Sequence, residues 1–160
     1  MQRLTTIGVY GAQLESFLAA LGRAEVRQLL DLRQRRGVRG REYAWANAQR
    51  LQRVLTDAGI EYRHHGELAP TTELRHLQYA EDAAQGVGKR SRIALAPVYV
   101  ARYEREILDA VDLRALVAAM PDDAATTLFC VERDPAACHR SLVAGRIGRE
   151  FGLTVHHLYP

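Results

Sequence analysis

The feature that most constrains the fold is an alternation of short apolar segments with amphipathic helical ones. Residues 4–9 and 26–32 have the Val, Ile, Leu and Thr content of strands, and apolar side chains recur at helical spacing over residues 14–21. A strand, a helix and a strand at this spacing form a βαβ unit, in which the two strands are parallel. The alternation therefore predicts an α/β protein.

A second unit of this kind lies near the end of the chain. Residues 128–131 form a continuous apolar run, which is typical of a strand covered on both faces. Asp134 and Pro135 match the cap and the first position of a helix that Gly152 ends. Residues 153–158 follow as a further strand, so this strand and the one at 128–131 are expected to be parallel.

The middle of the chain completes the predicted layout. The other expected elements are a helix over 42–58, a strand over 60–63 and helices that begin near Thr72, Pro97 and Asp112. Residues 86–92 have the glycine and basic content of a mobile loop. We expect one domain over 1–160, a mostly parallel sheet of about five strands, and helices on both faces of the sheet.

The composition is that of an ordinary globular protein, with 48% hydrophobic and 26% charged residues. No apolar run is long enough to cross a bilayer, and the N-terminus lacks a signal-peptide core, so we expect a cytoplasmic protein without a membrane partner. Cys130 and Cys138 are then expected to be free thiols. The net charge of +3 permits an anionic partner but does not require one.

Side chains capable of chemistry cluster where the apolar run 128–131 ends. Cys130, Glu132, Cys138, His139 and Arg140 all lie within this short segment. Open α/β sheets place their sites at the carboxyl ends of strands. A thiol near a helix start can act as a nucleophile, and a carboxylate in a cleft can act as a general base. The alternative is that both cysteines only fill space in the core.

Arg140 falls in the first turn of the expected helix, where its charge opposes the helix dipole. This position favours an anion bound at the helix start. The alternative is that Arg140 pairs with an acid such as Glu132 or Asp31. Asp31 and Arg33, at the end of the strand 26–32, present the same choice between a ligand site and an ion-pair network without catalysis.

The loop after that strand is the second functional signal. Residues 33–41 contain five arginines and no acid, which suits a phosphate backbone. Tyr43 and Trp45 follow, so a base could stack there, unless Trp45 belongs to the core. Arg39 from this loop and Tyr10 from the end of the first strand join the candidate substrate-binding residues.

No metal site is predicted from the sequence, and the cofactor stays open. The spacing Cys-x7-Cys-His is not a usual zinc spacing, and adjacent Cys and His side chains rarely bind one ion. The pairs His64–His65 and His156–His157 lie on expected strands, so one member of each pair should be in the core. Dinucleotide-binding, P-loop and nucleophile-elbow motifs are absent.

Three groups of segments together resemble the family called domain of unknown function 488. The segments are Thr6-Ile7-Gly8 with Phe17-Leu18, Asp31-Leu32-Arg33 with Gly59-Ile60-Glu61-Tyr62, and Cys130–Pro135 with Cys138-His139-Arg140 and Val155-His156-His157. The resemblance spans nearly the whole chain and implies a compact α/β fold without an established activity. It also implies one site made of Asp31, Arg33, Cys130, Glu132, Cys138, His139 and Arg140. Residues 34–39 lack the Pro and Ser-Arg usual in relatives, so the substrate can differ from theirs.

Two functions of different classes are consistent with these features. The first is a thiol- or carboxylate-dependent hydrolase or transferase for a phosphate-bearing small molecule, a nucleotide or a nucleic acid. Its catalytic candidates are Cys138, Glu132, His139, Asp31 and Cys130, and its substrate-binding candidates are Arg33, Arg140, Arg39 and Tyr10. The second is a non-catalytic nucleic-acid-binding module that uses residues 33–41 and 89–92. A third interpretation makes the polar set a purely structural ion-pair network.

Overall fold

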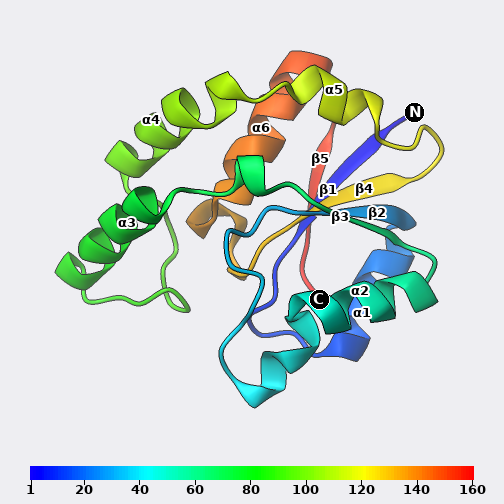
Figure 1. Cartoon of the computed structure of the whole chain (residues 1–160), viewed down its shortest axis with the longest axis horizontal. Helices are drawn as coiled ribbons and strands as arrows, with labels where there is room; N and C mark the ends of the chain where they lie inside the picture. Colours follow the sequence, from blue (N-terminus) through cyan, green and yellow to red (C-terminus); the bar gives the residue numbers. More distant parts are fainter.

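A five-stranded sheet, parallel throughout, runs through the middle of the computed structural model, which describes residues 1–160 (Figure 1). The strands are β1 (Arg3–Ile7), β2 (Val26–Asp31), β3 (Glu61–His64), β4 (Ala125–Phe129) and β5 (Val155–Leu158). Their order across the sheet is β3-β2-β4-β1-β5. This arrangement confirms the α/β class and the predicted sheet of about five strands.

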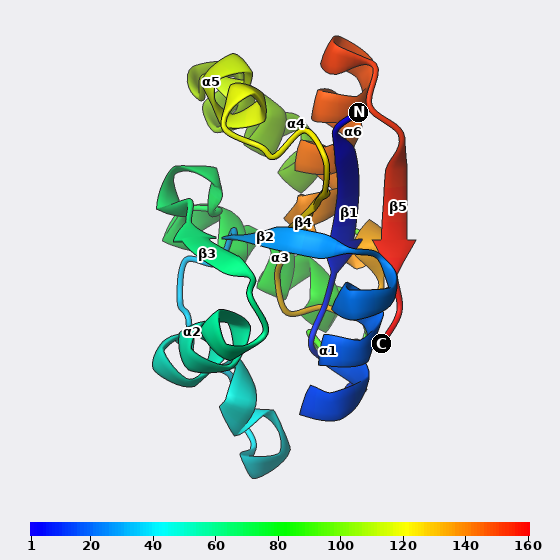
Figure 2. The same ribbon diagram turned by 90° about the vertical axis from the view of Figure 1, so that its right-hand side faces the viewer.

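Helices cover both faces of this sheet, as the sequence predicts (Figure 2). The helices are α1 (Leu14–Arg23), α2 (Ala48–Asp57), α3 (Thr72–Ala84), α4 (Pro97–Glu106), α5 (Leu113–Ala118) and α6 (His139–Phe151). Buried residues of α1 and α2 belong to one apolar cluster, and those of α3 to α6 belong to the other. None of these helices has the length and apolar character needed to span a membrane.

Alternation along the strands separates the two apolar clusters. Leu29 and Phe129 face α1 and α2, whereas their neighbours Leu30 and Leu128 face the helices on the other side. Successive side chains of a strand point to opposite faces, so each central strand contributes to both clusters. All four of these side chains are at most 2% exposed, which shows that the central strands are covered on both faces.

The fourth strand begins earlier and ends earlier than the apolar run predicts. It spans Ala125–Phe129, so Thr126 and Thr127 are buried strand residues. Thr126 is accommodated because its hydroxyl donates to the side-chain carbonyl of Gln28 on the neighbouring strand (3.1 Å). A strand that contains two threonines does not stand out as apolar, which explains the misplaced boundaries.

Two predicted helices are interrupted by short 3₁₀ segments. The helix expected over 42–58 is a 3₁₀ helix, Arg41–Ala46, followed by α2 after Asn47. Asp134 caps a 3₁₀ turn, Pro135–Ala137, and α6 begins only at His139, because Cys138 between them has an extended backbone. Pro97, Asp112 and Gly152 hold their predicted positions at helix ends, and α3 begins at Thr72 as expected, with the preceding Thr71 as its cap.

The strand order brings the chemically capable loops to one edge of the sheet. β4 lies between β1 and β2, so the carboxyl ends of all three strands are neighbours. The helix that follows β1 packs on one face of the sheet, and the helix that follows β4 packs on the other. Such a divergence opens a crevice at the carboxyl ends of the strands, and this crevice is where α/β proteins place their sites.

Candidate functional site

A cavity of about 700 Å³ occupies this crevice. Four of its lining residues, Cys130, Glu132, Cys138 and His139, are called the floor. Its rim consists of residues 33–35 and 37–39 after β2, residues 88–92, and Tyr10 and Arg75. The cavity therefore joins the thiol-bearing segment and the arginine-rich loop that the sequence marks as separate signals.

The His139 ring links the two thiols of the floor. Its Nδ1 lies 3.8 Å from Cys138 Sγ and 3.9 Å from Cys130 Sγ. Its Nε2 lies 2.9 Å from the carbonyl oxygen of Leu32, just after β2. A carbonyl oxygen only accepts, so Nε2 carries the proton, and in the neutral ring Nδ1 directs its lone pair toward the sulfur atoms.

The two thiols have different acidities. Burial by itself raises the pKa of the Cys138 thiol, but hydrogen bonding with Cys130 and the positive charges of His139 and Arg140 bring that pKa well below its ordinary value. The hydrogen bond with Cys138, together with burial, raises the pKa of Cys130 well above its ordinary value. The floor therefore favours one thiolate, at Cys138, beside one neutral thiol.

Glu132 completes the floor and is held by partners that the sequence does not suggest. Its Oε1 accepts from Arg92 at 3.0 Å and lies 3.9 Å from Lys89 Nζ, and its Oε2 accepts from Cys130 Sγ at 3.5 Å. Burial, followed by the charge on Cys138, raises the pKa of Glu132 despite the two nearby cations. The carboxyl group can thus hold or release a proton at the floor.

Asp31 and Arg33 meet at the same edge of the sheet but form a closed ion pair. Two nitrogens of Arg33 donate to the two Asp31 oxygens at 2.9 and 2.8 Å, and the third donates to the carbonyl oxygen of Ala46 at 2.8 Å. The Tyr62 hydroxyl donates to Asp31 at 2.6 Å. Both charged side chains are at most 1% exposed, so the arrangement matches the ion-pair alternative of the sequence analysis.

Arg140 also turns inward and does not line the cavity. Its guanidinium donates to the carbonyl oxygens of Glu132 and Arg133 and to the Thr6 hydroxyl. An anion or an acid was the expected partner of Arg140, whereas the structure provides backbone oxygens. A Cβ at Gly8 would lie 2.1 Å from the Glu132 carbonyl oxygen, so the glycine permits this close approach. Arg140 thus fixes the turn that carries the floor.

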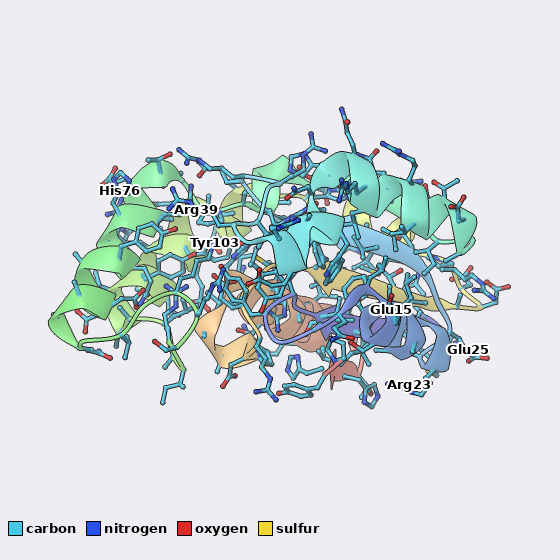
Figure 3. All side chains as sticks on the ribbon, turned by 90° about the horizontal axis from the view of Figure 1, so that it is seen from below. Glu15, Arg23, Glu25, Arg39, His76 and Tyr103 are labelled. Carbon is cyan, nitrogen blue, oxygen red and sulfur yellow. The ribbon has the colours of Figure 1, made fainter.

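Two guanidinium groups of the rim have no partner within the protein, whereas Arg90 pairs with Glu42 at 3.6 Å. Arg35 and Arg39 are exposed and make no side-chain hydrogen bond or ion pair. Arg90 donates to the carbonyl oxygen of Arg39 at 2.9 Å, and its guanidinium lies 5.1 and 5.3 Å from the ring centroids of Tyr10 and Tyr43. The two basic loops are thus held side by side, and Arg39 is the labelled rim residue in Figure 3.

Positive charge dominates the cavity lining. The basic residues that line it are Arg33, Arg35, Arg39, Arg75, Lys89, Arg90 and Arg92, and the only acid is Glu132. Arg33 and Arg92 are neutralised by buried carboxylates, which leaves the excess charge on the rim. The lining therefore carries a net positive charge.

A family model described as Domain of unknown function DUF488 matches residues 13–147 of the chain. The chain belongs to this family. The match includes the floor and the Asp31–Arg33 pair, whereas β1, Tyr10 and β5 lie outside it. Neither a curated protein nor a solved structure matches the chain. The family's description names no activity, so the site itself is the basis for a functional proposal.

Part of this candidate site could not be predicted from the sequence. Residues 86–92 were expected to form a mobile loop, yet Arg92 is 7% exposed and donates to both Asp82 and Glu132. The concentration of basic residues over 89–92 was a usable signal, but nothing in the sequence connects Arg92 with Asp82. Asp82 lies on α3, ten residues before Arg92, and the two side chains meet only because the loop folds back over this helix.

The structure also decides the positions of Trp45 and of the two histidine pairs. Trp45 packs on Phe17 with ring centroids 4.8 Å apart and joins the core, so it is not a stacking platform. The expectation of one core histidine in each pair is wrong, since His64, His156 and His157 are exposed and His65 is half-buried. β3 and β5 are the edge strands of the sheet, where neither face is fully covered.

Proposed function

We propose that this DUF488 protein is an enzyme that binds a phosphate-bearing small molecule at the rim and transforms it at the floor. One observation carries the proposal: a single cavity connects unpaired arginines to a buried group of thiol, imidazole and carboxyl side chains. Clustering of groups with perturbed pKa values in a cleft is a physical signature of active sites. A hydrolase or a transferase fits these groups.

Arg35 and Arg39 are the primary candidates for anion binding. Guanidinium groups present a planar fork of donors that suits the oxygens of phosphate, and neither side chain has to break a bond within the protein to bind. Tyr10 and the stacked Arg90 flank the same opening and can contact the remainder of the substrate. Arg33, the other expected anion ligand in this loop, already pairs with Asp31 and serves to hold the start of the loop.

The floor provides the reacting groups. Cys138 with Cys130 offers nucleophilic or metal-binding sulfur, and Glu132 can exchange a proton. His139 orients both sulfur atoms, since its far nitrogen is fixed on the Leu32 carbonyl oxygen. Asp31 and Arg140 belong to the frame around the site rather than to the reacting set.

The test measures binding of pyrophosphate and of adenosine monophosphate by calorimetry. The variant Arg35→Ala/Arg39→Ala should bind at least about tenfold more weakly, because a hydrogen bond to a charged group contributes about 1.5–3 kcal/mol. The matched control is Arg23→Ala/Arg27→Ala, which removes equal charge from exposed positions near the opposite ends of the strands. Figure 3 shows Arg23 far from Arg39. Equal weakening in both variants would reject a rim site.

The second candidate function is a non-catalytic nucleic-acid-binding module. The contact of Arg90 with Arg39 favours it, because this contact joins residues 33–41 and 86–92 into one basic surface beside Tyr10 and Tyr43. Such a surface would bind a single-stranded oligonucleotide with affinity that falls steeply with salt. Binding of this kind that survives Cys138→Ser and Glu132→Gln supports the module over the enzyme.

A further inference from the structure

We propose that the floor of the cavity is a binding site for a divalent transition-metal ion of the zinc class, with Cys130 Sγ, Cys138 Sγ and His139 Nδ1 as ligands. These three atoms lie within 4.8 Å of one another. Thiolate and imidazole are the ligands that zinc-class ions prefer over magnesium and calcium. The inference concerns the floor alone and holds whether or not the rim binds an anion.

The spacing of the three ligand atoms already approaches that of a tetrahedral site. With zinc–sulfur and zinc–nitrogen bonds of about 2.3 and 2.0–2.1 Å, a tetrahedral ion separates sulfur from nitrogen by about 3.6 Å. The observed separations of His139 Nδ1 from the two sulfur atoms are 3.8 and 3.9 Å. Both sulfur–nitrogen separations are thus within a few tenths of an ångström of the tetrahedral value. The two sulfur atoms lie within 4.8 Å of each other, and side-chain rotation can bring them to the separation of about 3.8 Å that such an ion requires.

The backbone at the start of α6 removes the sequence-based objection to adjacent ligands. Cys138 has an extended conformation, with φ −138° and ψ 142°, and His139 is the first residue of the helix. In a regular strand or helix, adjacent side chains point in different directions. The change of conformation between these two residues instead turns both side chains onto the same floor, where Cys130 arrives from the end of β4.

The surroundings of His139 match those of a metal-bound histidine. Its Nε2 donates to the Leu32 carbonyl oxygen at 2.9 Å, so Nδ1, which faces the two sulfur atoms, is the nitrogen that can bind a metal ion once it has released its proton. Metal-ligating histidines almost always donate their other N–H to a carbonyl or a carboxylate in this way. The exposed fractions of Cys130, Cys138 and His139 are 5%, 1% and 5%, so little water competes with the protein ligands.

A fourth coordination position would face the cavity. All three ligand residues line the cavity as part of its floor, and Glu132 Oε2 lies 3.5 Å from Cys130 Sγ. That carboxylate, a water molecule or a substrate oxygen can take the fourth position. Three protein ligands and one open position form the arrangement of catalytic zinc sites, whereas structural zinc sites are closed by four protein ligands.

The experiment titrates the purified, reduced chain, first freed of metal by a chelator, with Co²⁺ alone. We expect one ion per chain, with thiolate-to-cobalt charge-transfer absorption and the visible bands of tetrahedral cobalt, and displacement of Co²⁺ by Zn²⁺. Zn²⁺ should also protect both cysteines of the unmodified protein from alkylation. Absence of stoichiometric uptake, or uptake that leaves both cysteines open to alkylation, overturns the proposal.

Variants assign the ligands one by one. Cys130→Ser, Cys138→Ser and His139→Asn should each weaken Co²⁺ binding by at least about 100-fold, because loss of an outer-shell partner alone costs up to that factor. His156→Asn, an exposed histidine on β5, is the matched control and should bind Co²⁺ as the unmodified chain does. Circular dichroism verifies that each variant is folded. Unchanged Co²⁺ affinity in any folded ligand variant removes that residue from the site.

Discussion

The Asp31–Arg33 pair and the cavity floor lie at the same edge of the sheet, yet their polar atoms are used in opposite ways. A hydrogen bond from His139 to Leu32, the residue between Asp31 and Arg33, joins the two regions. The charges of the pair are satisfied inside the protein and are at most 1% exposed. The sulfur atoms of the floor instead have only long contacts with His139 and Glu132 and face the cavity.

This difference separates residues that hold a site together from residues that can react. Both regions combine acids and bases at strand ends, so residue type and position in the chain do not distinguish them. The partners of the polar atoms distinguish the two regions, because a buried pair whose donors and acceptors are satisfied within the protein has none left to bind a ligand. We therefore expect substitutions in the pair to affect stability and substitutions at the floor to affect function.

The largest effect is expected from Arg33→Leu. This change leaves the Asp31 carboxylate buried without its cation, and such a loss costs about 3–5 kcal/mol of folding free energy. Urea unfolding followed by circular dichroism measures it. The double variant Asp31→Asn/Arg33→Leu should recover part of the loss, because no uncompensated charge stays buried. A cost below about 1 kcal/mol for Arg33→Leu would show that the pair is not the frame of the site.

A smaller effect with a distinct pH dependence is expected from Tyr62→Phe. Removal of the hydroxyl that donates to Asp31 should cost about 1 kcal/mol near neutral pH. Burial is the largest cause that raises the pKa of Tyr62 above 10.0, and the hydrogen bond to Asp31 raises it further, against the lowering effect of Arg36.

The sign of that pH dependence follows from the raised pKa. The stability that the neutral Tyr62 hydroxyl contributes is fully present below pH 10.0 and is lost as the pH rises through the folded-state pKa. The stabilities of the unmodified chain and of Tyr62→Phe should therefore converge above pH 10.0 in urea unfolding. A difference in stability between the two proteins that stays constant above pH 10.0 would contradict the hydrogen bond from Tyr62 to the Asp31–Arg33 pair.

The smallest effect on stability is expected from Cys138→Ser. The serine hydroxyl is close in size to the thiol and keeps His139 Nδ1 nearby as a hydrogen-bond partner, so the free energy of unfolding should change by less than about 1 kcal/mol. The reactivity of the metal-free chain should change much more, since the Cys138 thiol, with its lowered pKa, is expected to be alkylated before Cys130. Mass mapping of alkylated peptides identifies which thiol reacts first. Preferential alkylation of Cys130 would contradict the assignment of the thiolate.

Much of the fold was predictable because local rules and tertiary packing agree there. Pro97, Asp112 and Gly152 mark helix ends by backbone geometry that does not depend on the rest of the chain. The boundaries of β4 were not predictable, since burial of Thr126 depends on Gln28 from another strand. The conformation of Cys138 was likewise not evident, because a short 3₁₀ turn before α6 resembles a helix start in sequence.

The sequence by itself determined the α/β class and the parallel units, and its motifs indicated the family and the residue types available for a site. These depend on periodicity and on residue types, which are local properties of the chain. Only the tertiary structure decided that Arg140 binds backbone oxygens, that Asp31 and Arg33 satisfy each other, and that Cys130, Cys138 and His139 converge. The physical reason is that a polar side chain takes whichever partners the fold brings within hydrogen-bond distance.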